Sequence, residues 1–283
     1  MSRHLVETTM RKFMISGVLT AVLSLPFPAS AQELSAPGPH EPPKSRTTAE
    51  VFGGVDYEQG TYGTGAKVET ASAKIGVGLR KGRVRLAAAI PYVRTTAPID
   101  VVVSQGGLFG TPLLGSNTSQ TVRTRREGIG DAAIEAAYDL PAEGFIASLG
   151  AGVKLPTASR SKGLGTGKVD YAVNAEIARP LRGGITPFAA VGYTLVGKPA
   201  GFAVRNTLAA SAGTRIALSS RASAAISYSY EQSAARARAD RQSIGFGVGV
   251  ALGRKLQLGL QSEAGLSRGA PDVRLGLRLG AGF

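Results

Sequence analysis

The chain has 283 residues, and its composition is unusual for a water-soluble protein of that length. It contains 38 glycines but no cysteine or tryptophan, only 18% of its residues are charged, and its net charge is +14. The lack of cysteine excludes disulfides and thiolate chemistry, and the two histidines, His4 and His40, lie outside every predicted strand. We therefore expect no metal site, no cofactor and no histidine-dependent enzyme. The basic residues also lack the aromatic interleaving of a nucleic-acid binder.

Residues 1–31 predict a signal peptide. Basic residues precede an apolar run over residues 13–27, and small residues follow at the positions that a signal peptidase recognises. We therefore expect cleavage between Ala31 and Gln32. The run is shorter than the roughly 20 residues that span a bilayer, which disfavours an N-terminal membrane anchor. Translation begins at Met1 or at Met10. Residues 32–46 then form a flexible, proline-rich lead-in.

Residues 47–283 predict a β-barrel domain. Segments of about ten residues alternate apolar and polar side chains, which is the pattern of a strand with one apolar face. An even number of strands brings both ends of the chain to the same side of a membrane barrel. A count between ten and fourteen fits, and we count twelve segments: 48–57, 67–80, 83–95, 129–140, 145–155, 169–179, 185–196, 205–218, 221–231, 241–252, 256–266 and 272–283.

The connections between these segments alternate in length. Tight turns such as 81–82 and 219–220 follow one end of the strands, and mostly longer loops such as 58–66 and 96–128 follow the other. Outer-membrane barrels have this asymmetry, with short periplasmic turns and long extracellular loops. A soluble β-sandwich, which is the alternative for alternating strands, has no reason to keep it.

The polar face of the segments carries charged residues of both signs. Each would cost roughly 2–4 kcal/mol if it faced lipid near the bilayer midplane, so we place them in the lumen. A twelve-stranded bore is narrower than that of a porin, which predicts a narrow or partly plugged channel. The alternative is that the charges pair across the lumen and only maintain the barrel. The solute-path candidates are Asp131, Glu135, Lys154, Asp170, Glu176, Arg215, Glu231, Glu263, Arg274 and Arg278.

Two predicted loops carry arginine clusters. They predict contact with anionic lipopolysaccharide or attraction of anionic solutes, and the alternative is a solvated loop surface. The glycine-rich stretch 163–169 lacks the spacing of a phosphate-binding loop and leads into a strand, so we expect a loop with positive φ angles there. The clustered arginines are Arg123, Arg125 and Arg126 in the first loop and Arg236, Arg238 and Arg241 in the second.

Three motifs share a spacing with a known family. Gly128-Ile129-Gly130-Asp131 opens a strand, Lys154-Leu155-Pro156-Thr157 closes the next, and Leu164-Gly165-Thr166-Gly167 follows with Asp170 after it. Over residues 128–180 this pattern resembles the phenol meta-pathway family of outer-membrane transporters. The chain departs from the pattern at Ala158, where glycine is usual, and in the loop 96–128. The resemblance implies a barrel that admits hydrophobic or aromatic small molecules.

Together these features predict an all-β, antiparallel, up-and-down barrel in the bacterial outer membrane. We expect a passive channel for small solutes. The alternative is a closed structural or surface-interaction barrel whose basic loops bind lipopolysaccharide or a partner, and an enzyme ranks third. The expected partners are outer-membrane lipid, lipopolysaccharide, a small-molecule solute and the barrel-insertion machinery, to which Phe283 presents an aromatic C-terminus as similar outer-membrane proteins do.

Overall fold

The computed structural model describes residues 47–63, 66–99, 101–103, 113–114 and 122–283. The predicted signal peptide and lead-in, with Ala31 and Gln32, lie outside this range. No helix in the described part of the chain is long and apolar enough to span a membrane. The strands are β1 (Thr47–Gly60), β2 (Val68–Lys81), β3 (Val84–Pro98), β4 (Val101–Val102), β5 (Leu113–Leu114), β6 (Arg123–Ile129), β7 (Ala132–Leu140), β8 (Ile146–Leu155), β9 (Asp170–Ala178), β10 (Ile185–Leu195), β11 (Thr207–Ala217), β12 (Ala222–Glu231), β13 (Arg241–Ala251), β14 (Leu256–Gly265) and β15 (Val273–Gly282).

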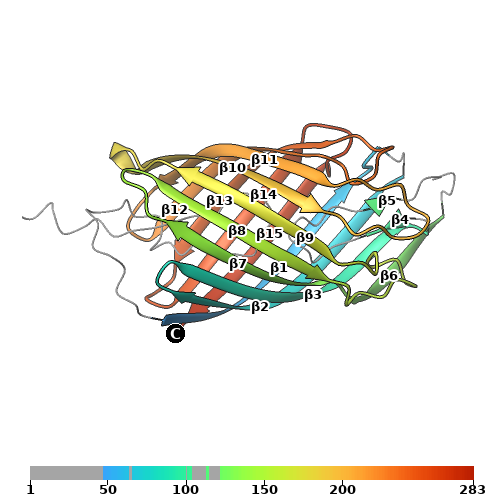
Figure 1. The fold of residues 1–283 in the computed structure, drawn as a ribbon, viewed down its shortest axis with the longest axis horizontal. Coiled ribbons are helices and arrows are strands. Elements are labelled where there is room, and N and C mark those ends of the chain that lie inside the picture. The colour runs from blue at the N-terminus through green and yellow to red at the C-terminus, as the bar shows by residue number, and fades with distance from the viewer. Residues whose placement is uncertain (1–46, 64–65, 100, 104–112, 115–121) are drawn as a thin grey trace, which may run out of the picture.

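The strands close into one antiparallel barrel (Figure 1). Sequential neighbours pair around the wall, and β1 pairs with β15 to close it. Strands β6 and β7 occupy successive stretches of the same partner, β3, so they count as one wall strand with a break at Gly130 and Asp131. The wall therefore has twelve strands, as the sequence predicts, and β4 and β5 form a separate pair outside it.

The two ends of the barrel differ. Tight connections join β2 to β3 and β13 to β14 at the end where the C-terminus lies, on the left in Figure 1. The long connections, including the one that carries β4 and β5, gather at the opposite end. This asymmetry identifies the long-loop end as the extracellular mouth of an outer-membrane barrel.

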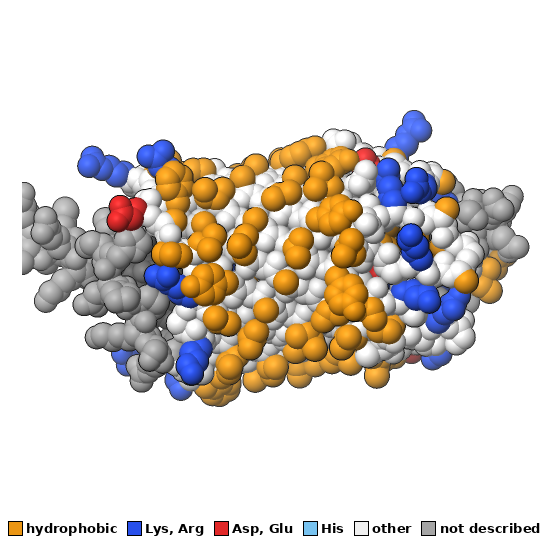
Figure 2. Space-filling model, viewed as in Figure 1, with side chains coloured by type: hydrophobic (Ala, Val, Ile, Leu, Met, Phe, Trp, Pro, Cys, Tyr) orange, Lys and Arg blue, Asp and Glu red, His pale blue; other side chains and the backbone are white. Residues whose placement is uncertain are grey.

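The outer surface of the barrel is apolar in its middle. Side chains that alternate along each strand point outward and are exposed, for example Ile75, Val77 and Leu79 on β2 and Leu275, Leu277 and Leu279 on β15. Orange apolar side chains cover the central band in Figure 2, and Lys and Arg side chains lie at the two ends. A closed barrel with an apolar belt and charged rims is the architecture that spans the bacterial outer membrane.

The predicted strand bounds need one substantial correction. The connection 96–128 was expected to be a loop throughout, but β3 extends to Pro98 and β6 begins at Arg123. Gly128-Ile129-Gly130-Asp131 therefore does not open a strand and instead lies at the break between β6 and β7. The φ angle of Gly128 is 159°, and the Gly130 amide donates to the Pro91 carbonyl, so the β6–β7 strand stays attached to β3 across the break.

Candidate functional site

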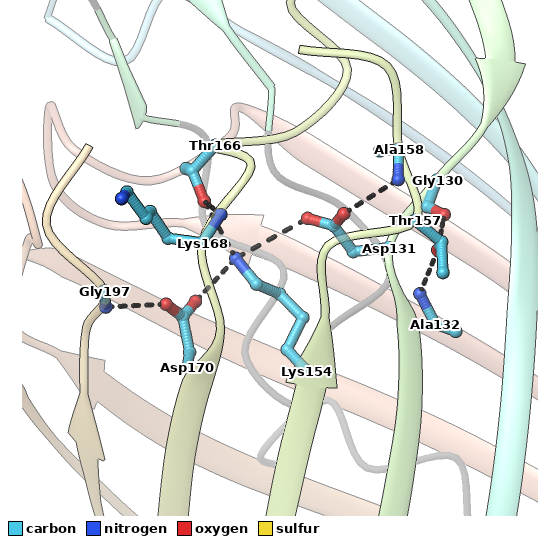
Figure 3. A network of polar contacts seen from close by, with 10 residues as sticks. All are labelled: Gly130, Asp131, Ala132, Lys154, Thr157, Ala158, Thr166, Lys168, Asp170 and Gly197. Atoms are coloured by element: carbon cyan, nitrogen blue, oxygen red, sulfur yellow. Dashed lines mark hydrogen bonds and ion pairs between the residues drawn. The ribbon is translucent and has the colours of Figure 1, made fainter. Parts of the chain in front are cut away.

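The three sequence motifs meet at one place in the extracellular half of the barrel (Figure 3). Lys154, at the end of β8, extends its ammonium group between the carboxylates of Asp131 and Asp170. Its Nζ lies 2.6 Å from Asp170 Oδ2 and 3.5 Å from Asp131 Oδ2, and 3.4 Å from Thr166 Oγ1. Lys154 and Asp131 are almost fully buried, so this ion pair is screened little by water.

The same network fastens the connection between β8 and β9 to the wall. The Ala158 amide donates to Asp131 Oδ1 at 3.1 Å, and the Gly197 amide donates to Asp170 Oδ1 at 2.8 Å. The Thr157 hydroxyl donates to the Gly130 carbonyl at 2.7 Å and accepts from the Ala132 amide at 2.8 Å, so it bridges the strand break. A carboxylate that accepts backbone N–H bonds and faces a cation is held in one orientation.

The connection itself turns back into the mouth of the barrel. Gly163 and Gly167 adopt positive φ angles of 63° and 67°, as the sequence predicts for this glycine-rich stretch. Between them Leu164 is 0% exposed and packs with Val93 and Ala158 on the inner side of the wall. The loop is therefore part of the barrel interior.

Apolar side chains cross the mouth above this loop. Val101 and Val103, from the connection after β3, pack with Tyr62, Val68 and Ala97 on one side of the barrel. Val102 lies against a second cluster, formed by Val204 and Ala234 with Val196 and Phe202 at its edge. This second cluster belongs to the connections after β10 and β12, so residues 101–103 link opposite sides of the mouth.

Along the inner wall, most of the other predicted solute-path residues form ion pairs. Arg215 pairs with Glu176 at 2.7 Å and lies over the Phe188 ring, with its guanidinium carbon 4.1 Å from the centroid. Arg241 pairs with Glu263 at 2.8 Å, and Arg274 lies 3.6 Å from Asp56. Glu231 lies opposite Arg241 in the β12–β13 register. Arg278 lies opposite Gly54 and Gly259, and Glu135 lies on β7 between Ala133 and Ala137.

The glycines of the inner wall differ in the room around them. A side chain at Gly76 or Gly213 would meet the ring of Phe52 or Phe188 at 2.3 and 2.9 Å. At Gly247 and Gly259, on β13 and β14, the nearest atoms would lie at 3.8 and 3.9 Å, which is an ordinary van der Waals contact. The two phenylalanine rings therefore require glycine beside them, whereas Gly247 and Gly259 line the bore without such a neighbour.

Most of the clustered arginines have a partner. Arg125 and Arg236 are exposed at the extracellular end, and Arg125 lies 3.4 Å from Glu127. Arg123 pairs with Glu69, and Arg126 donates to the Val101 carbonyl at 2.7 Å. The first cluster was expected in a loop but lies on β6. Arg238 donates to the Gly63 carbonyl at 3.2 Å. Arg241 was grouped with the second loop cluster and also opened the predicted segment 241–252; the second assignment is confirmed, because Arg241 begins β13 and is buried in the lumen.

One acidic residue of the β12–β13 connection anchors its own loop. Asp240 accepts hydrogen bonds from the Tyr230 hydroxyl at 2.7 Å, the Ser233 amide at 3.0 Å and the Arg205 guanidinium at 2.9 Å. Burial raises the pKa of Asp240, but these donors outweigh burial and hold the pKa below its ordinary value.

Several lumen residues escaped the sequence analysis. Asp139 pairs with Arg80 and Arg85, both at 2.9 Å, near the periplasmic end. Asp56 lies 3.7 Å from Lys74. Asp139 could have been found, because it follows Asp131 and Glu135 at intervals of four on the same face. The mouth clusters had no such pattern, because their residues come from connections without periodicity.

The fold and the lumen define the class of this protein, which is a transmembrane β-barrel of the bacterial outer membrane. The chain belongs to the family described as "Putative MetA-pathway of phenol degradation", whose profile matches residues 55–282. This confirms the family that the motifs at Asp131, Lys154 and Thr166 indicate.

Several solved structures are similar to this chain at low sequence identity. An outer membrane channel from Pseudomonas putida F1 is 17% identical, with 87% of this chain and 99% of that chain covered and a TM-score of 0.65. The NanC porin is 11% identical over 83% and 98% of the two chains, with a TM-score of 0.46. The translocator domain of the autotransporter NalP from Neisseria meningitidis is 13% identical over 85% and 89%, also with a TM-score of 0.46. A comparison with curated proteins finds no match.

Proposed function

We propose that the protein is a passive channel through which small apolar or aromatic solutes cross the outer membrane. The observation that carries this proposal is the apolar mouth, where Val102 lies against a cluster that includes Val196 and Phe202. Apolar solutes gain free energy when they leave water for such a surface, at about 25 cal/mol per Å² of apolar area. The lumen below, with its glycine-lined side, supports a path onward. We propose transport and not catalysis because the strands carry neither histidine nor cysteine.

The test compares uptake of a radiolabelled aromatic hydrocarbon by cells with and without the protein in their outer membrane. We expect faster uptake with the protein, and a decrease when Phe202→Asp places a charge in the apolar mouth. Ala237→Asp, which places the same charge at an exposed position in the β12–β13 connection, is the matched control and should leave uptake unchanged. Equal uptake with and without the protein, together with no conductance in planar bilayers, would contradict the proposal.

A second proposal concerns the exposed cations at the same end of the barrel. Arg125 and Arg236 are exposed at the extracellular end, and guanidinium groups bind phosphates, such as those of lipopolysaccharide, bidentately. We expect the double variant Arg125→Ser/Arg236→Ser to reduce the lipopolysaccharide that copurifies with the barrel. Arg182→Ser, on the periplasmic rim, is the control. If the double variant retained all of its lipopolysaccharide, only the transport proposal would remain.

A further inference from the structure

The β7 strand and the break before it carry three acidic residues at intervals of four, all on the inner face: Asp131, Glu135 and Asp139. The first and the last are in ion pairs, with Lys154 and with Arg80 and Arg85. The middle one is different. Among the described buried side chains, Glu135 is the acid for which neither carboxylate oxygen has a hydrogen-bond partner.

The neighbours of Glu135 explain why its oxygens are left without donors. In the strand register it lies opposite Ala87 on β3 and Gly152 on β8, and Ala133 and Ala137 flank it along β7. None of these side chains can donate a hydrogen bond, and all are small. The carboxylate is only 3% exposed, and a buried polar group without a partner is unfavourable unless a ligand supplies one.

The charges around Glu135 restrict the class of ligand. The cations that act on it most strongly are Lys74 on β2 and Arg278 on β15. A cationic ligand would therefore be repelled by these two groups. An uncharged hydroxyl can donate to the carboxylate oxygen, and its apolar body can lie against the alanine and glycine surface beside it.

We propose that Glu135 is a solute-binding residue of the lumen, which accepts a hydrogen bond from an uncharged molecule that carries a hydroxyl group on a compact apolar body. Because Glu135 is only 3% exposed, this binding requires the lumen side chains around it to rotate and admit the solute. This inference rests on the proposed channel function and assigns the residue that distinguishes one solute from another.

The test measures binding of two matched probes to the purified, folded barrel in detergent by titration calorimetry. Benzyl alcohol has the hydroxyl donor, and benzyl methyl ether keeps the ring and the oxygen but lacks the donor. We expect the wild-type protein to bind the alcohol about tenfold more tightly than the ether, because only the alcohol can donate a hydrogen bond to Glu135.

Two variants distinguish the effect of the hydrogen-bond acceptor of Glu135 from the effect of its side-chain volume. Glu135→Leu should abolish the preference for the alcohol while leaving ether binding within about twofold, because the apolar surface is retained. Glu135→Gln keeps a carbonyl acceptor and should retain part of the preference. Glu143→Gln, in the exposed turn after β7, is the control. Folding of each variant is checked by its heat-dependent migration in a gel.

The outcomes separate this inference from the proposed function. Equal binding of both probes by the wild-type protein, or an alcohol preference that survives in Glu135→Leu, would overturn the role of Glu135 and leave the channel proposal intact. Cells that take up an aromatic hydrocarbon no faster with the protein would overturn the channel proposal itself.

Discussion

At the scale of single residues, Lys154 carries the most consequential contact in the mouth. Its ammonium group is the shared partner of Asp131 and Asp170, which come from different strands and orient two different connections. Removing one partner of a buried ion pair leaves uncompensated charge, whereas an exposed pair contributes little. The stability of the mouth therefore depends on one side chain.

We expect Lys154→Met to lower the free energy of unfolding by about 3–5 kcal/mol, the cost of leaving a buried charge unpaired. Lys198→Met, at an exposed position, should change it by less than about 0.5 kcal/mol. Urea unfolding of the barrel in lipid vesicles measures both. Equal stability of the two variants would show that Lys154 is dispensable.

The hydrogen bonds of Asp240 predict an acid limit for the β12–β13 connection. Its pKa in the folded protein is lower than in the unfolded chain, so its stabilising contribution is complete above the unfolded pKa of about 3.9 and is lost as the pH falls further. We expect the amide of Ser233 to be equally protected from exchange at pH 7 and pH 5 and to lose this protection below about pH 4. Hydrogen exchange, corrected for its intrinsic pH dependence, measures this, and Asp240→Asn should be less protected at every pH. Opening already at pH 5 would contradict the prediction.

At the scale of elements, the connection between β8 and β9 behaves as part of the core. Leu164 is buried between Val93 and Ala158, and the carbonyl of Gly163 accepts a hydrogen bond from the Val103 amide at 3.0 Å. One extracellular loop thus holds another across the mouth. Loosening the first should therefore loosen the second.

We expect Leu164→Ala to destabilise this loop by about 2–5 kcal/mol, as for other buried leucines. The loop backbone should then unfold locally, so that trypsin cuts after Arg160 and Lys162, whose side chains are already exposed. Limited proteolysis of the folded barrel followed by mass spectrometry detects the cuts. Leu181→Ala, at an exposed position in a periplasmic turn, is the control and should resist trypsin as the wild type does. Identical digestion of both variants would mean that Leu164 does not hold the loop.

The terminal strand carries a second element-scale prediction. Phe283 is 70% exposed, and its amide donates to the Ala49 carbonyl at 2.7 Å, a bond that does not involve the ring. We propose that the insertion machinery recognises the ring, and we therefore expect Phe283→Ser to reduce the amount of barrel assembled in cells while refolding of purified protein into vesicles proceeds unchanged. Immunoblots of outer membranes and refolding yields test the two halves. A loss of refolding in vitro would assign the ring a structural role instead.

The strands were predictable from sequence, and the mouth was not. A barrel wall has lipid on one side and the lumen on the other, so apolar and polar side chains alternate along each strand, as at Val273 to Phe283 and at Val84 to Ile90. The period of this alternation and the lengths of the turns therefore suffice to place each strand. Arg241 was assigned both to a loop cluster and to a strand, because an inward arginine at a strand start looks the same in sequence as a loop arginine. Pairs such as Lys154 with Asp170 depend on the barrel register and cannot be derived from spacing.

At the scale of the whole molecule, successive residues of each wall strand face lipid and lumen in turn. Leu260, near the middle of β14, points outward, and Gln261 points inward, where its side chain donates to Asp56 Oδ1 at 3.0 Å. We expect Leu260→Lys to cost about 2–4 kcal/mol of stability in bilayers, and Gln261→Lys to cost much less because it faces a carboxylate. Unfolding titrations in vesicles compare them, and equal costs would contradict the assigned faces.

The closing pair of strands has a consequence for biogenesis. Residues of β1 find their partners on β15 at the far end of the chain, as Glu50 does with Gly282. Until β15 is synthesised, β1 presents a row of unpaired backbone groups, and such an edge readily pairs with other chains. A nascent chain that stops even one hairpin short has two such edges and no route to closure. Closure of the barrel is therefore all-or-none, because the edge strands can pair with each other only when both β1 and β15 are present.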